Sequence, residues 1–319
     1  MNYEELLIKV ITYDNPPEIP MRCGVLPAVW KQWPGEMRDI VLEFPGFFNA
    51  DYADYDYHTQ QPDSYRVGTW TDEWGCGWSN IEEGMFGLVT GHPVKTRADI
   101  RVLNIPDKRD GHIPHGFMYL RLLDLRGFEE AMVDFAEEPE ELQILVDKVA
   151  EYNRLQVEVA LQKAGPIMYF GDDLGMQCSL AIGPDKWRKY LKPAYQTIYA
   201  PIRAAGKHVY MHSDGMMHEI IPDLFECGAS MVNPQIRANG LDNLVRVCKG
   251  RYPIMLDLDR QLFPFATPEE CRAHVRESIE AMYLPEGGLG IVIEIGPCVP
   301  PANIRALLQT AREYRHYRG

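Results

Sequence analysis

The stretch VYMHSDG at residues 209–215 places an apolar run directly before two polar side chains and a glycine. Alternate residues of an extended strand point to the same side, so His212 and Asp214 are expected to leave one face at the end of a strand. Such a pair is typical of a metal site, of an acid/base pair or of a capped turn. The choice among the three depends on the fold around the stretch.

The same pattern, a short apolar run followed by polar residues, repeats along the second half of the chain. Strands are predicted at 166–170, 207–211, 229–232, 252–256 and 290–295, alternating with helices at 139–164, 183–206, 222–226, 241–249 and from Thr267 onward. The first half supplies three more candidate strands, at 19–24, 66–71 and 116–121. Eight strands alternating with helices predict a single (β/α)8 barrel domain over residues 1–319.

Two segments are expected to lie outside the barrel framework. Residues 1–18 form a predicted N-terminal arm. Residues 30–64 form a predicted insertion, and the sequence around it is rich in aromatic residues. The insertion is expected either to close over a flat apolar substrate or to be held in place by its own aromatic cluster.

Polar residues follow nearly every predicted strand, and the C-terminal ends of barrel strands carry the active site. We therefore expect catalytic side chains among Asp72, Asp172, Asp173 and Glu294, and substrate-binding side chains among Trp74, Asn233, Gln235 and Asp257. A solvated turn is the alternative for each of these residues when it is considered alone. His112 and His115 precede the predicted strand at 116–121 and are expected at the opposite end of the barrel.

The composition disfavours nucleic acid and membranes as partners. The net charge of −14 disfavours binding to nucleic acid or to an anionic membrane, and no apolar run is long enough to span a bilayer. The N-terminal sequence MNYEELLIKV does not resemble a signal peptide. Seven scattered cysteines without a CxxC motif indicate reduced thiols and a cytoplasmic protein.

Several motifs in order resemble the uroporphyrinogen decarboxylase superfamily, and most closely its cobalamin-linked methyltransferase branch. They are TDEWG at 71–75, GFMYLRLLDLRGFE at 116–129, FGDDLG at 170–175, MHSDG at 211–215 and GPCVPPANIRALL at 296–308. The resemblance implies a barrel fold and one of two chemistries. Decarboxylation of a tetrapyrrole would use an arginine-rich loop, of which this chain retains Arg22 but has Leu26 in place of the second arginine. Asp72 matches the aspartate that contacts the pyrrole nitrogens in decarboxylases.

The methyltransferase branch holds zinc with a His-x-Cys pair and a distant cysteine. The resemblance places His212 and Cys298 at two of these positions, with Asp214 in place of the middle cysteine. A carboxylate in place of a thiolate makes zinc harder and more Lewis acidic, which favours polarisation of an ether oxygen. We therefore predict transfer of a methyl group from a small O-methyl donor. Glu294 is an alternative third ligand, and Asp172 or Asp173 is expected to orient His212.

The predicted methyl acceptor is the cobalt of a cobalamin carried by a partner corrinoid protein. Cobalamin domains of this pathway contain an Asp-x-His-x-x-Gly motif, and this chain has none. Two alternatives remain open at this point. One is a decarboxylase-like lyase that acts on a tetrapyrrole or another carboxylate, and the other is a barrel that binds a ligand without catalysis.

Overall fold

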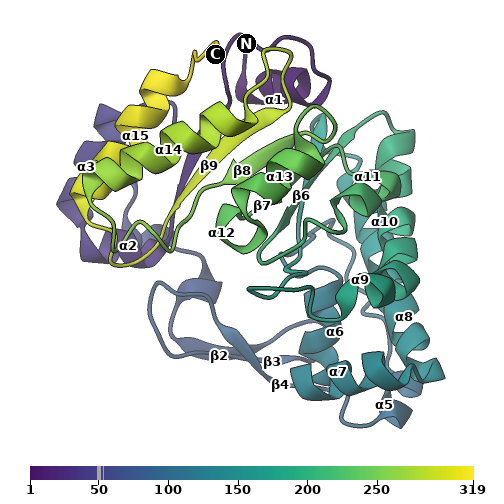
Figure 1. Ribbon diagram of the computed structural model, residues 1–319. Helices are drawn as coiled ribbons and strands as arrows, with labels where there is room; N and C mark the ends of the chain where they lie inside the picture. The colour runs from purple at the N-terminus through teal and green to yellow at the C-terminus, as the bar shows by residue number, and fades with distance from the viewer. Residues whose placement is uncertain (49–51, 53) are drawn as a thin grey trace. The chain divides into compact units, whose positions relative to one another are not determined.

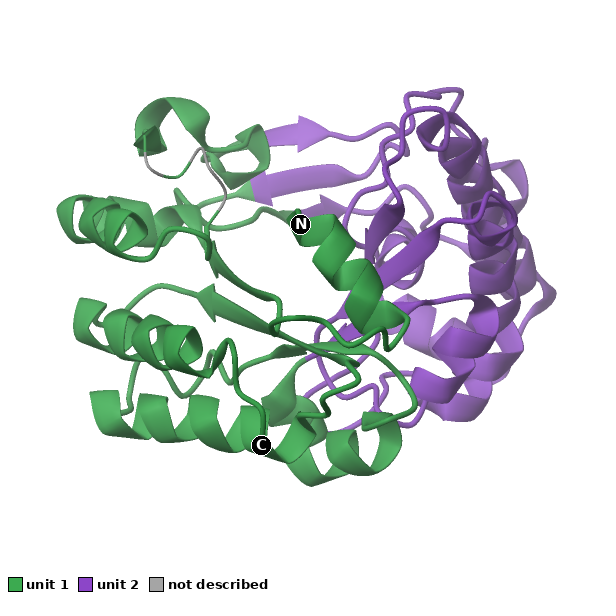
Figure 2. Ribbon diagram, turned by 90° about the horizontal axis from the view of Figure 1, so that it is seen from above, with its two compact units in different colours: residues 1–68, 80–88, 235–319 green, residues 69–79, 89–234 purple. Residues whose placement is uncertain are grey.

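The computed structural model describes residues 1–48, 52 and 54–319, and its contacts divide the chain into two compact units. Unit 1 comprises Met1–Gly68, Asn80–Leu88 and Gln235–Gly319, and unit 2 comprises Thr69–Ser79 and Val89–Pro234. Figure 2 shows the two units in different colours. The single barrel domain predicted for residues 1–319 stays a prediction.

Unit 1 is built around three parallel strands in the order β1-β9-β8. Met21 pairs with Ile291 and Ile254 pairs with Leu289, so both neighbours of β9 run parallel to it. The strands are β1 (Met21–Val25), β8 (Ile254–Asp257) and β9 (Leu289–Ile295). The helices are α1 (Tyr3–Ile11), α2 (Pro27–Gln32), α3 (Pro34–Glu43), α4 (Tyr57–Gln60), η2 (Asp63–Tyr65), α12 (Ile236–Asn239), α13 (Leu241–Cys248), α14 (Pro268–Met282) and α15 (Pro301–Tyr314). Helices α14 and α15 pack side by side against this sheet (Figure 1).

Unit 2 contains three more parallel strands, in the order β7-β6-β5. Ile167 pairs with His208 and Tyr210 pairs with Met231. The strands are β5 (Ile167–Gly171), β6 (His208–Ser213) and β7 (Met231–Pro234). The helices are α5 (Arg97–Val102), α6 (Tyr119–Arg126), α7 (Phe128–Glu137), α8 (Glu140–Ala160), α9 (Gly183–Lys186), the π-helical turn η3 (Trp187–Leu191), α10 (Lys192–Ala204) and α11 (Ile221–Cys227).

The prediction of an eight-stranded barrel is not confirmed, because two of the eight segments lie outside the parallel sheet. Residues 66–71 contribute to β2 (Gly68–Thr71), which joins β3 (Gly77–Asn80) and β4 (Leu88–Gly91) in a separate three-stranded sheet. Its largely exposed side chains differ from those of a strand buried on both faces. Residues 116–121 run into helix α6, whose buried Leu122 and Leu125 lie three residues apart on one helical face. Among the described residues, seven of the eight predicted segments contain a strand, and six of these strands belong to the parallel sheet.

The predicted helices of the second half are confirmed within a few residues. The start predicted at Thr267 is a capping box: the Thr267 hydroxyl accepts from the backbone N–H of Glu270, while the Glu270 carboxylate accepts from the backbone N–H of Thr267. The predicted N-terminal arm contains α1, whose buried Leu6, Leu7 and Val10 pack within unit 1. The predicted arm is therefore part of the hydrophobic core of unit 1.

The predicted insertion at 30–64 includes residues 49–51 and 53, which lie outside the described residues. In the described part, the Trp30 ring lies 5.6 Å from the Tyr52 ring and 4.9 Å from the Tyr55 ring, centroid to centroid. These contacts support the alternative in which an aromatic cluster holds the insertion.

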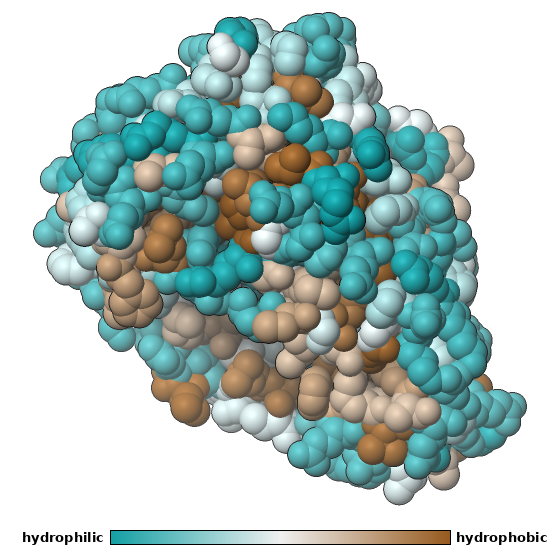
Figure 3. Space-filling view, in the orientation of Figure 1, coloured by the Kyte–Doolittle hydropathy of each residue, from teal (hydrophilic) through white to brown (hydrophobic). Residues whose placement is uncertain are grey.

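Hydrophilic residues cover much of the surface shown in Figure 3, with hydrophobic residues in separate patches. None of the described helices combines the length and the apolar character that a membrane span requires.

Candidate metal centre

The register between β5 and β6 brings the ends of these two strands together. Gly171 pairs with His212, so the residues that follow each strand leave the sheet at the same end. Asp173, His212 and Asp214 each place one ligand atom there, and all three atoms lie within 4.8 Å of one another. The predicted pair of His212 and Asp214 therefore exists, with Asp173 as a third member.

His212 has a polar neighbour at each ring nitrogen. Its Nδ1 lies 2.8 Å from the Asn233 side-chain oxygen, and its Nε2 lies 3.1 Å from a carboxylate oxygen of Asp214. When the ring is neutral and Nδ1–H donates to Asn233, the lone pair of Nε2 is directed toward Asp214. Asn233, predicted to bind substrate, thus orients His212, which is the role that the sequence assigned to Asp172 or Asp173.

Asp173 is held at both carboxylate oxygens. Oδ1 accepts from the backbone N–H of Asp214 at 2.9 Å, and Oδ2 lies 3.1 Å from His115 Nε2. Burial alone would raise the pKa of Asp173, but the hydrogen bond and charge of His115 outweigh it, so the pKa is lowered. The same ion pair outweighs the opposing effect of burial on His115 and raises its pKa.

Two glycines allow the loops that carry these ligands to touch. Gly215 has φ 77°, and a Cβ there would collide with the carbonyl of Gly175. A Cβ on Gly175 would in turn collide with the backbone of Met216. The Met216 N–H donates to the carbonyl of Met176 at 2.8 Å, which ties the two loops together. The glycines are required because only bare backbone fits between the loops.

Asp172 points away from the cluster and binds two helices. It is fully buried, and it accepts from the backbone N–H groups of Tyr119 and Leu120 at 2.6 and 2.9 Å and from the Tyr195 hydroxyl at 2.6 Å. Burial raises its pKa to about 6 against the opposing effect of these hydrogen bonds. Its contacts are those of a helix cap, and the catalytic roles predicted for Asp172 and Asp173 stay predictions.

Asp72 also has its carboxylate oxygens bound by other residues of unit 2. It forms an ion pair with the buried Arg121 and accepts from the indole N–H of Trp78 at 3.0 Å and from two backbone N–H groups. Burial alone would raise its pKa, but Arg121 and these hydrogen bonds lower it. Trp74 is buried with its ring 5.1 Å from the Tyr152 ring. The catalytic role predicted for Asp72 and the substrate contact predicted for Trp74 stay predictions.

The remaining candidates belong to unit 1, where an arginine that the sequence did not single out links two of them. Arg260 forms ion pairs with the fully buried Asp257 and, at 2.6 Å, with Glu294. Cys298 is exposed with φ 67°, and its backbone N–H donates to the Gln32 side chain at 2.9 Å. Arg22 lies in β1, and Gln235 precedes α12. The ligand role of Cys298 and the substrate contacts of Arg22, Gln235 and Asp257 stay predictions.

His115 is the residue of this site that the sequence placed wrongly. The sequence predicts a strand at 116–121 and therefore places His115, which precedes it, at the opposite end of the barrel. Instead the Gly116 N–H donates to the carbonyl of Gly171 at 2.7 Å, which sets His115 beside the C-terminal end of β5. Its imidazole ring lies 5.8 Å from that of His212.

The donor set of the cluster fits a divalent cation. One imidazole nitrogen and two carboxylates are ligands that zinc accepts in proteins, and three protein ligands leave a further position open. The side chains of Asp173, His212 and Asp214 are 29%, 21% and 37% exposed, so solvent or a substrate can reach the space between them. Two carboxylates at this separation repel each other, and a cation between them would offset that repulsion.

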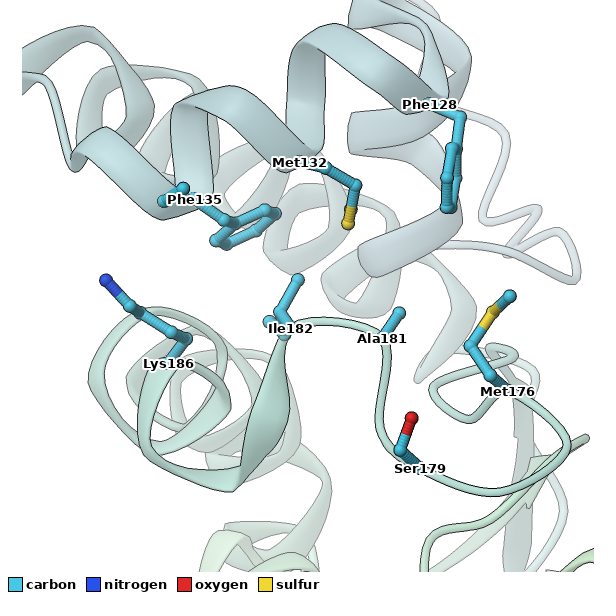
Figure 4. A pocket seen from close by; sticks show the side chains of 9 residues that line it. Phe128, Met132, Phe135, Met176, Ser179, Ala181, Ile182 and Lys186 are labelled. Carbon is cyan, nitrogen blue, oxygen red and sulfur yellow. The ribbon is translucent and has the colours of Figure 1, made fainter.

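A separate cavity of about 400 Å³ lies in unit 2 between α7 and the loop after β5. Figure 4 shows Phe128, Met132 and Phe135 facing Met176 and Ile182 across it. Its polar side chains are Ser179 and Lys186, and Lys186 forms an ion pair with Glu138. Among the described residues that line this cavity there is no cluster of titratable groups like the one at the strand ends.

The comparisons with known proteins agree with this fold. Residues 117–314 match the model of the uroporphyrinogen decarboxylase (URO-D) family, and the chain belongs to that family. Its structure is similar to that of a methyltransferase from Methanosarcina mazei, with a TM-score of 0.69 and 16% sequence identity over 98% of this chain and 99% of that chain. At this identity the likeness shows a shared α/β fold. No curated protein matches the sequence.

The structural role of Asp172 predicts unequal effects of two neighbouring hydroxyl deletions. Tyr195→Phe removes a hydrogen bond to a buried carboxylate and should lower the free energy of unfolding by about 2 kcal/mol. Tyr199→Phe removes a buried hydroxyl that has no hydrogen-bond partner among the described residues, so its effect should be close to zero. Denaturant unfolding measures both, and equal losses in the two variants would contradict the assignment.

Proposed function

We propose that this chain is a metal-dependent methyltransferase that moves a methyl group from a small O-methyl donor to the cobalt of a partner corrinoid protein. The observation that carries the proposal is the cluster of Asp173, His212 and Asp214 at the ends of β5 and β6. Membership of the URO-D family and the structural likeness to a methyltransferase support it.

The metal that best suits this cluster is zinc, with His212 Nε2 and one oxygen from each of Asp173 and Asp214 as ligands. A zinc ion held there would act as a Lewis acid toward the oxygen that bears the methyl group. One imidazole and two carboxylates form a harder ligand set than the His/Asp/Cys set expected from the sequence. This ligand set supports the proposal of an oxygen substrate.

The other residues of the site fix the ligands in place. In the neutral tautomer whose Nδ1–H donates to the Asn233 side-chain oxygen, Nε2 of His212 carries no proton and would face the metal. The backbone N–H of Asp214 holds one oxygen of Asp173 and couples the two acidic loops. The half-buried position lets a small donor approach while most of the cluster is shielded from bulk water.

Cobalamin is supplied, in this proposal, by another protein. The sequence has no Asp-x-His-x-x-Gly motif that would hold a corrinoid, so the cobalt must be presented to the metal site by a separate corrinoid protein. The cytoplasm, where thiols stay reduced, is the compartment we propose for this reaction.

Metal stoichiometry tests the assignment of the cluster. Purified wild-type protein, dialysed against zinc and then against metal-free buffer, should retain about one equivalent of zinc by elemental analysis. The variants His212→Ala, Asp214→Ala and Asp173→Ala should each lose most of it, because each removes a ligand.

Two further variants serve as controls. Cys298→Ala should retain zinc if the three clustered residues suffice, and Glu294→Gln should retain it because Arg260 already pairs with Glu294. Zinc retained in all three cluster variants would overturn the metal site. The His212 and Asp214 pair would then be better explained as an acid/base or substrate-binding pair of a decarboxylase-like lyase.

The proposed need for a corrinoid protein as methyl acceptor can be tested separately. Zinc-loaded protein alone should be colourless and should not demethylate an O-methyl donor. Addition of a corrinoid protein with reduced cobalt should produce the absorbance change of methylcobalamin formation in the presence of donor. A purified chain that already carries stoichiometric corrinoid would contradict the proposal.

A further inference from the structure

We propose that His115 is a positioning residue of the metal centre, which holds Asp173 in the orientation that binding requires. The inference rests on the proposed function, since it concerns the same site. It assigns a role to a histidine that lies outside the cluster of ligand atoms and on a different segment of the chain.

The contact between His115 and Asp173 leaves the carboxylate free to bind a cation. His115 Nε2 lies 3.1 Å from Oδ2, and the backbone N–H of Asp214 donates to Oδ1 at 2.9 Å. A carboxylate has about four lone-pair sites on its two oxygens. Two hydrogen bonds therefore fix the plane of the Asp173 carboxylate and still leave lone pairs for a metal.

His115 itself does not complete the ligand set. The ligand atoms that lie within 4.8 Å of one another come from Asp173, His212 and Asp214 among the described residues, and His115 is not part of this group. Its hydrogen bond to a ligand is the arrangement by which an outer histidine orients a carboxylate.

Hydrogen bonds of the neighbouring residues hold His115 beside Asp173. The Gly116 N–H donates to the carbonyl of Gly171 at 2.7 Å, and Asp172 accepts from the backbone of Tyr119 and Leu120. The residues that follow His115 are thus bound to Gly171 and Asp172, the two residues directly before Asp173. A Cβ on Gly171 would collide with Nδ1 of His115, so the bare Gly171 backbone provides the space for the ring.

Without His115, the Asp173 side chain would lose one of its two fixed oxygens. The terminal torsion of an aspartate is broad, so a carboxylate held at one oxygen samples orientations that do not face the metal. Removal of such outer partners typically weakens metal binding about 10–100-fold. The effect should appear in affinity rather than in folding, because the His115 side chain is 46% exposed.

The test is a zinc titration of the whole chain against a chromogenic chelator, which reports the dissociation constant without any assay of activity. His115→Ala should weaken zinc binding about 10–100-fold. His115→Gln should recover most of that loss, since its amide N–H can reach the position of Nε2. Gly171→Ala should weaken binding as well, because it displaces the imidazole ring.

His112→Ala is the matched control, as it removes an exposed histidine from the same segment and should leave the zinc affinity unchanged. Thermal unfolding of the metal-free His115→Ala protein should match that of the wild type. One equivalent of zinc bound with equal affinity by wild type and His115→Ala would overturn the inference and leave the proposed metal site intact. A wild-type protein that binds no zinc would overturn the proposed function, and the inference with it.

Discussion

Repulsion between two carboxylates at the ends of neighbouring strands is the constraint that the rest of the site has to satisfy. The parallel register of β5 and β6 fixes where Asp173 and Asp214 emerge, and the contact of Gly175 with Gly215 keeps their loops together. Like charges at this separation cost free energy in a half-buried setting. A backbone N–H, the imidazole of His115 and, in our proposal, a divalent cation supply the compensation.

The two neighbouring acidic residues after β5 have different surroundings: one contacts helices, and the other belongs to the candidate metal cluster. Asp172 and Asp173 are adjacent in sequence, but Asp172 turns inward to cap α6 and to bind Tyr195 on α10, whereas Asp173 turns to the cluster with His212 and Asp214. The buried contacts of Asp172 hold the end of β5 rigidly. That rigidity helps to place Asp173 because precise ligand positions need support from the surrounding structure.

Much of the framework could be predicted because local patterns carry it. The alternation of apolar runs and helices located six strands, the spacing of His212 and Asp214 located two candidate ligands, and Thr267 marked a helix start. The contacts of His115 and Arg260 could not be predicted in the same way. Each depends on a partner 58 or 34 residues away, and on turns whose geometry the sequence does not encode in a local pattern.

The wrongly predicted strand at 116–121 shows the limit of a short apolar window. Phe117, Met118 and Tyr119 are all buried, as in a strand, yet they lie at the entry to α6. The helix is favoured by the carboxylate of Asp172, which binds its first backbone N–H groups from another part of the chain. Because of that long-range contact, His115 lies at the C-terminal end of β5 and not at the predicted opposite end.

X-ray absorption spectroscopy at the zinc edge of the metal-loaded protein tests the central claim most directly, because it reports the atoms bound to the metal. Zinc held by Asp173, His212 and Asp214 should show a first shell of nitrogen and oxygen only, at about 2.0–2.2 Å, with the outer scattering of one imidazole. A sulfur scatterer at about 2.3 Å would assign a cysteine such as Cys298 to the metal and would contradict this account.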